Sequence, residues 1–147
     1  NALLHQCMGL GILLLIAGFF HHGFYSSRLL LLPLLAIQFA FMLGVALLVA
    51  PLTVSYRDVL QLLPVLNMVW MFITPIFYSE HVVPASLRFM LFLNPMNYFV
   101  QMSRKLLLDG RVPGWLDWVI ITQMSLLTLL LGFSYYTRRH PRFADEL

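Results

Sequence analysis

The sequence predicts an all-α membrane protein, a polytopic bundle of about four transmembrane helices with a re-entrant helix pair before the last span. Charge-free segments at residues 29–56, 59–79 and 118–137 support this fold class. A helix needs about 20 apolar residues to cross the hydrocarbon core, and each segment is long enough. Composition agrees, because 61% of the residues are hydrophobic, only 10% are charged and the mean hydropathy is +0.84.

The first predicted element is an apolar membrane helix over about residues 2–20. It lacks the basic start and the small-residue cleavage site of a signal peptide. The chain begins with Asn1 rather than Met, so we expect residues 1–147 to form a single transmembrane domain that is the C-terminal part of a longer polypeptide. A short polar turn is predicted for residues 21–28.

The second element is a long helix over residues 29 to about 54. Pro33 falls in its first turns, where a missing amide hydrogen costs least. Ala36, Ala40 and Gly44 recur every four residues and form a stripe of small side chains. Such a stripe lets a second helix approach closely, so we predict helix packing there.

The third element follows the turn Tyr56-Arg57-Asp58 and is a helix over residues 59 to about 78. Asn67, Thr74 and Tyr78 fall along one face, at spacings of seven and four residues. Polar side chains within a bilayer usually face the bundle interior or a water-filled path, so these three are candidates to line a path. An interhelical hydrogen bond without a transport role explains the same pattern equally well.

The region before the last span has an unusual pattern. Residues 89–103 carry no charge, yet they are too few to cross a membrane, and Asn94-Pro95 interrupts them. We predict a re-entrant helix pair, broken at Asn94 and Pro95, that dips into the membrane and returns to the same side. The alternative is an ordinary amphipathic surface loop.

The last element is a helix over about residues 115–136, followed by a basic tail at residues 138–142. The acidic residues Asp58, Glu80, Asp109 and Asp117 lie at segment ends, so no buried carboxylate predicts a proton relay. The histidines lack the i, i+4 spacing of a helical metal site. We therefore predict no catalytic residue, no bound metal and no cofactor in this chain.

Charge and motifs exclude further classes. The formal net charge of +3 is typical of membrane loop ends that face lipid headgroups, and we expect no nucleic-acid partner. The lone lysine, Lys105, lies in R-K-L-L rather than in G-x-x-x-x-G-K-[ST], so this chain cannot build an ATP-binding P-loop. Any ATP that drives transport must be bound by a partner.

Several short motifs occur in a characteristic order. They are Val54-Ser55-Tyr56-Arg57-Asp58-Val59 at a membrane edge, Thr74-Pro75-Ile76-Phe77-Tyr78 at the end of a span, and then Leu93-Asn94-Pro95-Met96, Arg104 and Gly110. In this order the chain resembles the C-terminal half of type-2 ATP-binding-cassette (ABC) exporter permeases. It is most similar to the branch that exports lipid-linked polysaccharides such as O-antigen, capsule and teichoic acid. The resemblance covers nearly the whole chain from about Arg28 onward.

The resemblance implies a six-span permease that forms a homodimer on two nucleotide-binding ATPase subunits in the bacterial inner membrane. It places Tyr56, Arg57 and Asp58 on the cytoplasmic side as a candidate ATPase contact. It also places paired re-entrant helices, residues 80–115, at the outer mouth and the basic tail in the cytoplasm. The sequence departs from the family pattern at its start, because the amphipathic N-terminal helix, the first span or two, and the cytoplasmic coupling helix between spans two and three are absent from it.

We therefore expect a multi-pass transport subunit without chemistry of its own. It would move a lipid-linked polysaccharide or polyol phosphate across the inner membrane while the partner hydrolyses ATP. An exporter of drugs or lipids is the first alternative, because the same fold serves those substrates. A non-transporting membrane scaffold or a truncated remnant is the second. A membrane enzyme is least favoured, because the predicted spans hold no convincing acid, base or nucleophile.

Overall fold

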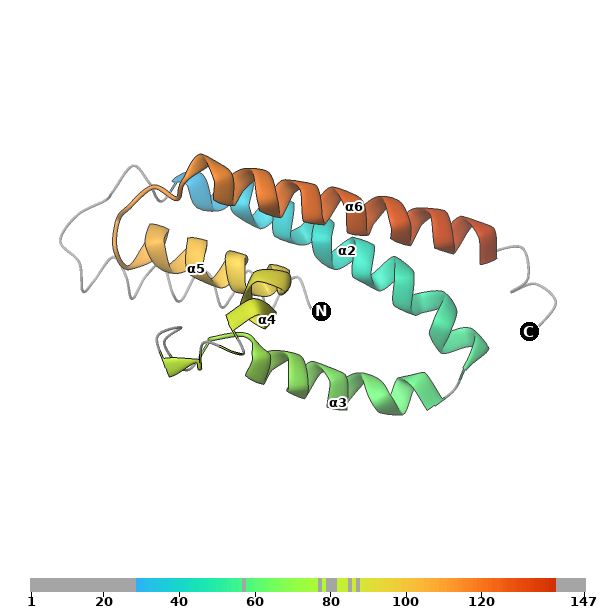
Figure 1. The fold of residues 1–147 in the computed structure, drawn as a ribbon. Coiled ribbons are helices and arrows are strands. Elements are labelled where there is room, and N and C mark those ends of the chain that lie inside the picture. Colours follow the sequence, from blue (N-terminus) through green and yellow to red (C-terminus); the bar gives the residue numbers. More distant parts are fainter. Residues whose placement is uncertain are drawn as a thin grey trace.

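The computed structural model describes residues 29–56, 58–76, 78, 82–84, 86 and 88–139. Within them every regular element is helical, as the sequence predicts, in the order α2 (Leu31–Ser55), α3 (Asp58–Ile73), α4 (Arg88–Leu93), α5 (Pro95–Leu107) and α6 (Trp115–Arg139) (Figure 1). The helix predicted for residues 2–20, the turn at 21–28 and tail residues 140–142 lie outside the described residues.

The long helices α2 and α6 lie side by side and run in the same direction (Figure 1). Each has 25 residues and is apolar enough to cross a membrane. At a rise of 1.5 Å per residue each is about 37 Å long, which exceeds the hydrocarbon core of about 30 Å. The described residues thus contain two candidate spans, and the total of about four stays a prediction.

The contact between α2 and α6 is closest at two glycines. A methyl group on Gly44 would lie 2.6 Å from the backbone nitrogen of Leu129, and one on Gly132 would collide with the carbonyl oxygen of Gly44. The predicted stripe meets α6 only in part, because Gly44 is buried, Ala40 is half-buried and Ala36 is exposed. A four-residue repeat advances by about 40° at each step, so Ala36 has rotated away from the contact.

Helix α3 ends at Ile73 and not near Tyr78, so the predicted end was too late. Pro75 has no amide hydrogen to continue the helical ladder, and its ring disfavours the helical conformation at Thr74. The chain turns sharply there, since the amide of Ile76 donates to the carbonyl of Thr74 at 2.7 Å. With 16 residues, α3 is about 24 Å long, shorter than the hydrocarbon core.

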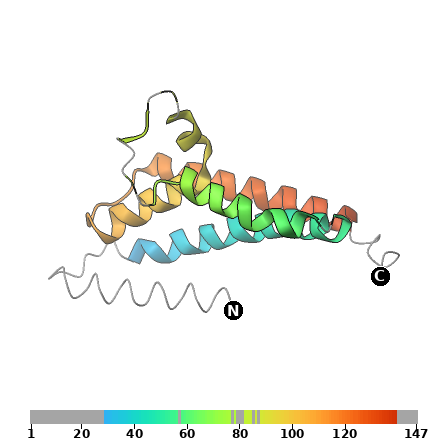
Figure 2. The ribbon, with the colours of Figure 1, turned by 90° about the horizontal axis from the view of Figure 1, so that it is seen from below.

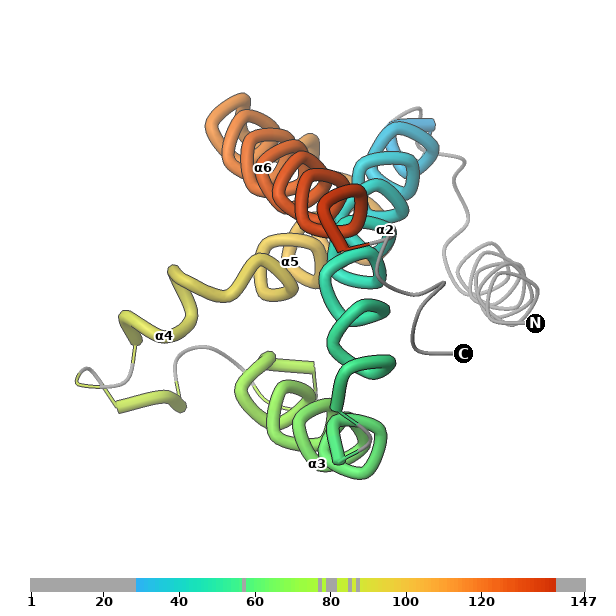
Figure 3. The backbone as a smooth tube through the Cα atoms, turned by 90° about the vertical axis from the view of Figure 1, so that its right-hand side faces the viewer, coloured from blue at the N-terminus to red at the C-terminus, as the bar shows by residue number. Residues whose placement is uncertain are grey.

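The hydrophobic core lies where α5 packs against α2 and α6. Its buried members are Leu31, Leu34 and Phe41 of α2, Phe99, Met102, Leu106 and Leu107 of α5, and Ile121 of α6. In the end-on view, α5 lies between α6 and α3 (Figure 3). None of the residues of α3, all of which are described, is buried. Helix α3 meets this core through Trp70, whose ring packs edge-on against Phe41 with a centroid separation of 6.5 Å.

Helices α4 and α5 are separated by one residue, Asn94, which belongs to the break that the sequence predicts. Helix α4 projects sideways from the bundle beyond α5 (Figure 2), and Leu91 is its one buried residue. The structure thus contains a helix pair at this place, and its dip into the membrane stays a prediction.

Candidate functional site

The residue that organises the region between α3, α4 and α5 is Asn94. Its side-chain Oδ1 accepts a hydrogen bond from the amide of Met96 at 3.1 Å and so caps the start of α5. Pro95 follows as the first helical residue, where its fixed φ suits the helix and its missing amide is not needed. The amide of Asn94 also donates to the carbonyl of Leu91 at 3.3 Å. Asn94 therefore ends one helix and begins the next.

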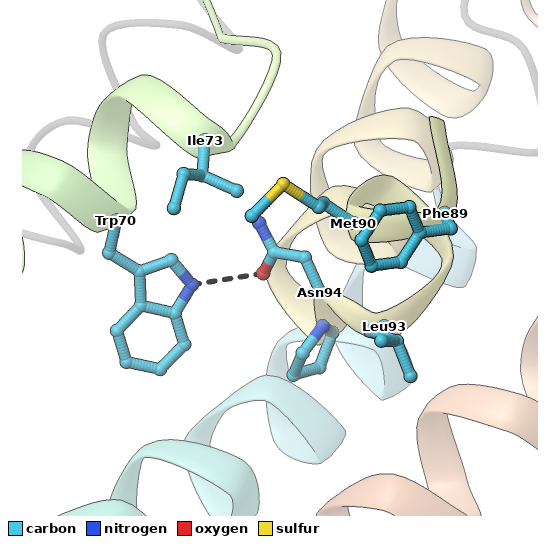
Figure 4. A pocket seen from close by; sticks show the side chains of 7 residues that line it. Trp70, Ile73, Phe89, Met90, Leu93 and Asn94 are labelled. Carbon is cyan, nitrogen blue, oxygen red and sulfur yellow. Dashed lines mark hydrogen bonds between the residues drawn. The ribbon is translucent and has the colours of Figure 1, made fainter. Parts of the chain in front are cut away.

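The same side chain binds α3. The indole Nε1 of Trp70 donates to Asn94 Oδ1 at 2.9 Å (Figure 4). Asn94 Nδ2 donates to Thr74 Oγ1, also at 2.9 Å. The Thr74 hydroxyl in turn donates to the carbonyl of Trp70 at 2.9 Å. We call Trp70, Thr74 and Asn94 the Asn94 cluster. Asn94 and Thr74 are 6% and 2% exposed, so these bonds are shielded from solvent.

A pocket of about 310 Å³ lies beside the cluster. It is lined by Trp70 and Ile73 of α3, Phe89, Met90 and Leu93 of α4, and Asn94 and Pro95 (Figure 4). The lining is mostly apolar, and the Asn94 amide oxygen is already engaged by two donors. The pocket therefore presents aromatic and aliphatic surface more than hydrogen-bonding groups.

A second asparagine stiffens the turn between α4 and α5. Asn97 Nδ2 donates to the carbonyl of Leu91 at 3.2 Å, so α4 and the first turn of α5 are joined internally. Asn97 Oδ1 is buried and has no hydrogen-bond partner within the described part of the chain. An amide flip would set that oxygen against the Leu91 carbonyl, so the present orientation is the better one.

The far end of α5 is tied to both neighbours. Arg104 Nη2 donates to the carbonyl of Ile76, just beyond α3, at 2.5 Å. Lys105 Nζ lies 2.9 Å from Asp117 Oδ2 in the first turn of α6. Gly110, in the connection between α5 and α6, has a φ of 62°, a conformation that costs other residues energy.

The predicted path-facing residues Asn67, Thr74 and Tyr78 differ in their exposure and hydrogen bonds. Thr74 is buried against Asn94, whereas Asn67 is exposed. The Tyr78 hydroxyl donates to the carbonyl of Phe72 at 2.8 Å and so satisfies the end of α3. Thr74 therefore makes the interhelical hydrogen bond that was the alternative interpretation, and the path-facing role of the set stays a prediction.

The predicted ATPase contact lies at the opposite end of α3 from the Asn94 cluster. Exposed Tyr56 follows the end of α2, exposed Asp58 begins α3, and Arg57 lies outside the described residues. The C-terminal end of α6, with Arg138 and Arg139, lies at this same end of the molecule (Figure 1). Among the described residues no group of three His, Cys, Asp or Glu side chains could hold a metal ion.

The sequence pattern does not predict Trp70 as part of the site, because tryptophan is expected at membrane edges in any case. One signal was present: a partly buried indole usually needs a hydrogen-bond acceptor, and Asn94 offers one in the segment predicted to break. The ion pair between Lys105 and Asp117 was also missed, since charges near segment ends look solvated in sequence.

Comparison with known proteins adds three findings. A family model described as ABC-2 type transporter matches residues 2–108. The chain is 24% identical over 138 residues to the O-antigen export system permease protein RfbA of Myxococcus xanthus. This aligned region covers 92% of this chain and 53% of the relative. It is 25% identical over 118 residues to the protein of the same name in Klebsiella pneumoniae, covering 79% of this chain and 45% of the relative.

The chain therefore spans about half the length of the curated relatives that it matches. No solved structure matches it.

Proposed function

The chain belongs to the ABC-2 type transporter family, and on this premise we propose that it is part of the membrane permease of an ATP-driven exporter of a lipid-linked polysaccharide or polyol phosphate. The observation that carries the substrate class is that both relatives are named O-antigen export permeases. The apolar helices support the membrane location, and we assign it to the bacterial inner membrane.

We assign ATP binding and hydrolysis to a partner subunit, because the sequence has no P-loop. Because this sequence cannot bind ATP through a Walker-type loop, a nucleotide-binding ATPase subunit supplies the energy. We propose that the partner contacts the turn Tyr56-Arg57-Asp58, whose described residues are exposed at one end of the bundle. Movement applied there would reach α3 directly, since α3 begins at Asp58.

The path itself needs a second copy in this proposal. Most of α3 is exposed and apolar, including Leu62, Val65, Leu66 and Val69. Such a surface can face lipid chains or another protein in the membrane. A homodimer would place apolar and aromatic side chains around an amphiphilic substrate, and the aromatic faces could stack on sugar rings.

The experiment is a neutralising substitution in the full-length permease, expressed with its ATPase in a strain that lacks the native gene. We expect Arg57→Gln to reduce surface glycan strongly, with lipid-linked glycan accumulating inside while the permease level in the membrane is unchanged. The matched control is Arg111→Gln at the opposite end of the bundle, which should export normally. Equal export by both variants would contradict the proposed ATPase contact.

The gene deletion decides between substrate classes. Loss of surface glycan without a change in drug sensitivity supports the proposal. Drug sensitivity with normal surface glycan would favour a drug exporter on the same fold. If neither phenotype appears, the hypothesis of a non-transporting membrane scaffold is favoured.

A further inference from the structure

Helix α3 is joined to the rest of the described structure mainly at its two ends. At its start, α3 is joined to α2 by the short connection that contains Tyr56. There the amide of Val59 donates to the Tyr56 carbonyl at 3.1 Å. At its other end the Asn94 cluster and the bond from Arg104 to Ile76 hold it. Between these ends no residue of α3 is buried. A helix held in this way can move about one end if the other is released.

Helix α5 has the opposite character. Phe99, Met102 and Leu106 are buried in the core with α2 and α6, and Lys105 pairs with Asp117 of α6. Asn94 and Asn97 bond the turn between α4 and α5 internally. The Asn94 cluster therefore connects a loosely packed helix to a firmly packed one. This makes the cluster the natural place for a relative movement.

The cluster can open while some of its polar groups keep their hydrogen bonds. If α3 moves away, the Thr74 hydroxyl keeps its bond to the Trp70 carbonyl, and Asn94 Oδ1 keeps its bond from Met96. Two donors lose their partners, Trp70 Nε1 and Asn94 Nδ2. Both residues line the open pocket, so water entering there can accept from them.

We propose that the Asn94 cluster is a releasable clasp. Closed, as in this structure, it holds the C-terminal half of α3 against the turn between α4 and α5. Opening it moves Trp70 and Thr74 away from Asn94 and widens the pocket between α3 and α4. Trp70, Thr74 and Asn94 are positioning residues in this device. That the clasp must open during export rests on the proposed function, whereas its existence does not.

The closed clasp is tested by distance measurements between spin labels at Phe72, an exposed residue of α3, and Leu108, an exposed residue after α5. The labels are placed on the full-length permease in a cysteine-free background. Thr74→Val removes the hydroxyl that accepts from Asn94 Nδ2 and leaves the shape of the side chain unchanged. We expect it to raise the population at longer distance about tenfold.

The matched control is Thr122→Val on α6. Its hydroxyl also donates to its own helix, to the carbonyl of Trp118 at 2.7 Å, but the side chain is exposed and holds no second helix. Thr122→Val and Thr74→Ser should both keep the short distance. An unchanged distribution in Thr74→Val, or an equal change in Thr122→Val, overturns the clasp. If Thr74→Val does not reach the membrane, Trp70→Phe, which removes the indole donor, replaces it with the same criteria.

The need for opening is tested by locking the clasp. Ile73 of α3 and Met90 of α4 extend toward each other across the pocket (Figure 4). A double variant, Ile73→Cys with Met90→Cys, is bridged by a reducible bifunctional thiosulfonate reagent. We expect export to stop when the bridge forms and to return on reduction, while each single variant exports throughout. Export by fully bridged protein overturns the required opening.

These outcomes keep the two proposals apart. An unbridged wild-type permease that exports no glycan would refute the proposed function. The spin-label comparison would still decide whether the clasp exists, because it measures distances and not transport.

Discussion

At the scale of single residues, Asn94 shows how far the sequence leads. The dipeptide Asn94-Pro95 predicts a helix break, because proline cannot continue a helix and asparagine is a favoured cap. It does not predict the partners of the side chain. Trp70 and Thr74 lie 24 and 20 residues away, and an amide can accept or donate to many groups. Only the placement of α3 beside the turn selects these two.

The ion pair between Lys105 and Asp117 provides a residue-scale prediction. The side chains are 41% and 26% exposed, so the pair is screened and contributes at most about 1 kcal/mol to stability. We expect Asp117→Asn to lower the thermal unfolding midpoint of the detergent-purified permease by a few degrees. The reversed pair, Lys105→Asp with Asp117→Lys, should recover most of the loss. Additive losses in the double variant would show that the two charges do not interact.

At the scale of elements, helix existence was predictable and helix partners were not. Charge-free segments indicate α2 and α6 directly, and the predicted boundaries differ from the observed ones by a few residues. The predicted end of α3 was wrong because the apolar pattern continues past Pro75. Hydropathy therefore favours a longer helix, whereas the proline favours an earlier end.

The packing partners of the helices could not be predicted from the sequence, since α2 and α6 are adjacent although three helices separate them in the chain. Periodicity identifies a face and not the helix that covers it.

The crossing of α2 and α6 gives an element-scale prediction. A methyl group at Gly132 meets backbone atoms of Gly44, which cannot rotate away as a side chain can. We expect Gly132→Ala to destabilise the permease by about 1–3 kcal/mol, despite the better helix propensity of alanine. Gly114→Ala is the control, because its nearest neighbouring atom would be Asp117 Oδ2 at 3.9 Å. Thermal unfolding of both variants measures the difference, and equal midpoints would mean that the helices are not in close contact.

At the scale of the whole molecule, membrane class was the safest inference, because hydrophobicity sums over every residue and needs no knowledge of contacts. The candidate site was less predictable, since it depends on how α3 lies against the turn between α4 and α5. The exposed apolar face of α3 belongs to this scale as well. In water such a face would drive association with other proteins, whereas in a bilayer it can remain exposed to the apolar lipid chains. The same surface therefore has a physical meaning only once the membrane is included.

The arrangement of the spans makes a prediction about sidedness. Tyr56 follows the end of α2, and Val112 precedes the start of α6; they are 63% and 64% exposed. Because α2 and α6 run in the same direction, these residues lie at opposite ends of the bundle (Figure 1). If both helices span the membrane, a membrane-impermeant maleimide should label Tyr56→Cys and Val112→Cys from opposite sides.

The side that each position faces tests the orientation as well. In intact cells and in inverted vesicles of a cysteine-free permease, the family resemblance places Tyr56→Cys inside and Val112→Cys outside. The reverse assignment would keep both spans and invert the topology, which would move the proposed ATPase contact to the wrong side. Labelling of both cysteines from one side would contradict the spans themselves. The orientation in the membrane therefore has to be determined from both spans together, because one helix alone does not show which end of the bundle faces the ATPase.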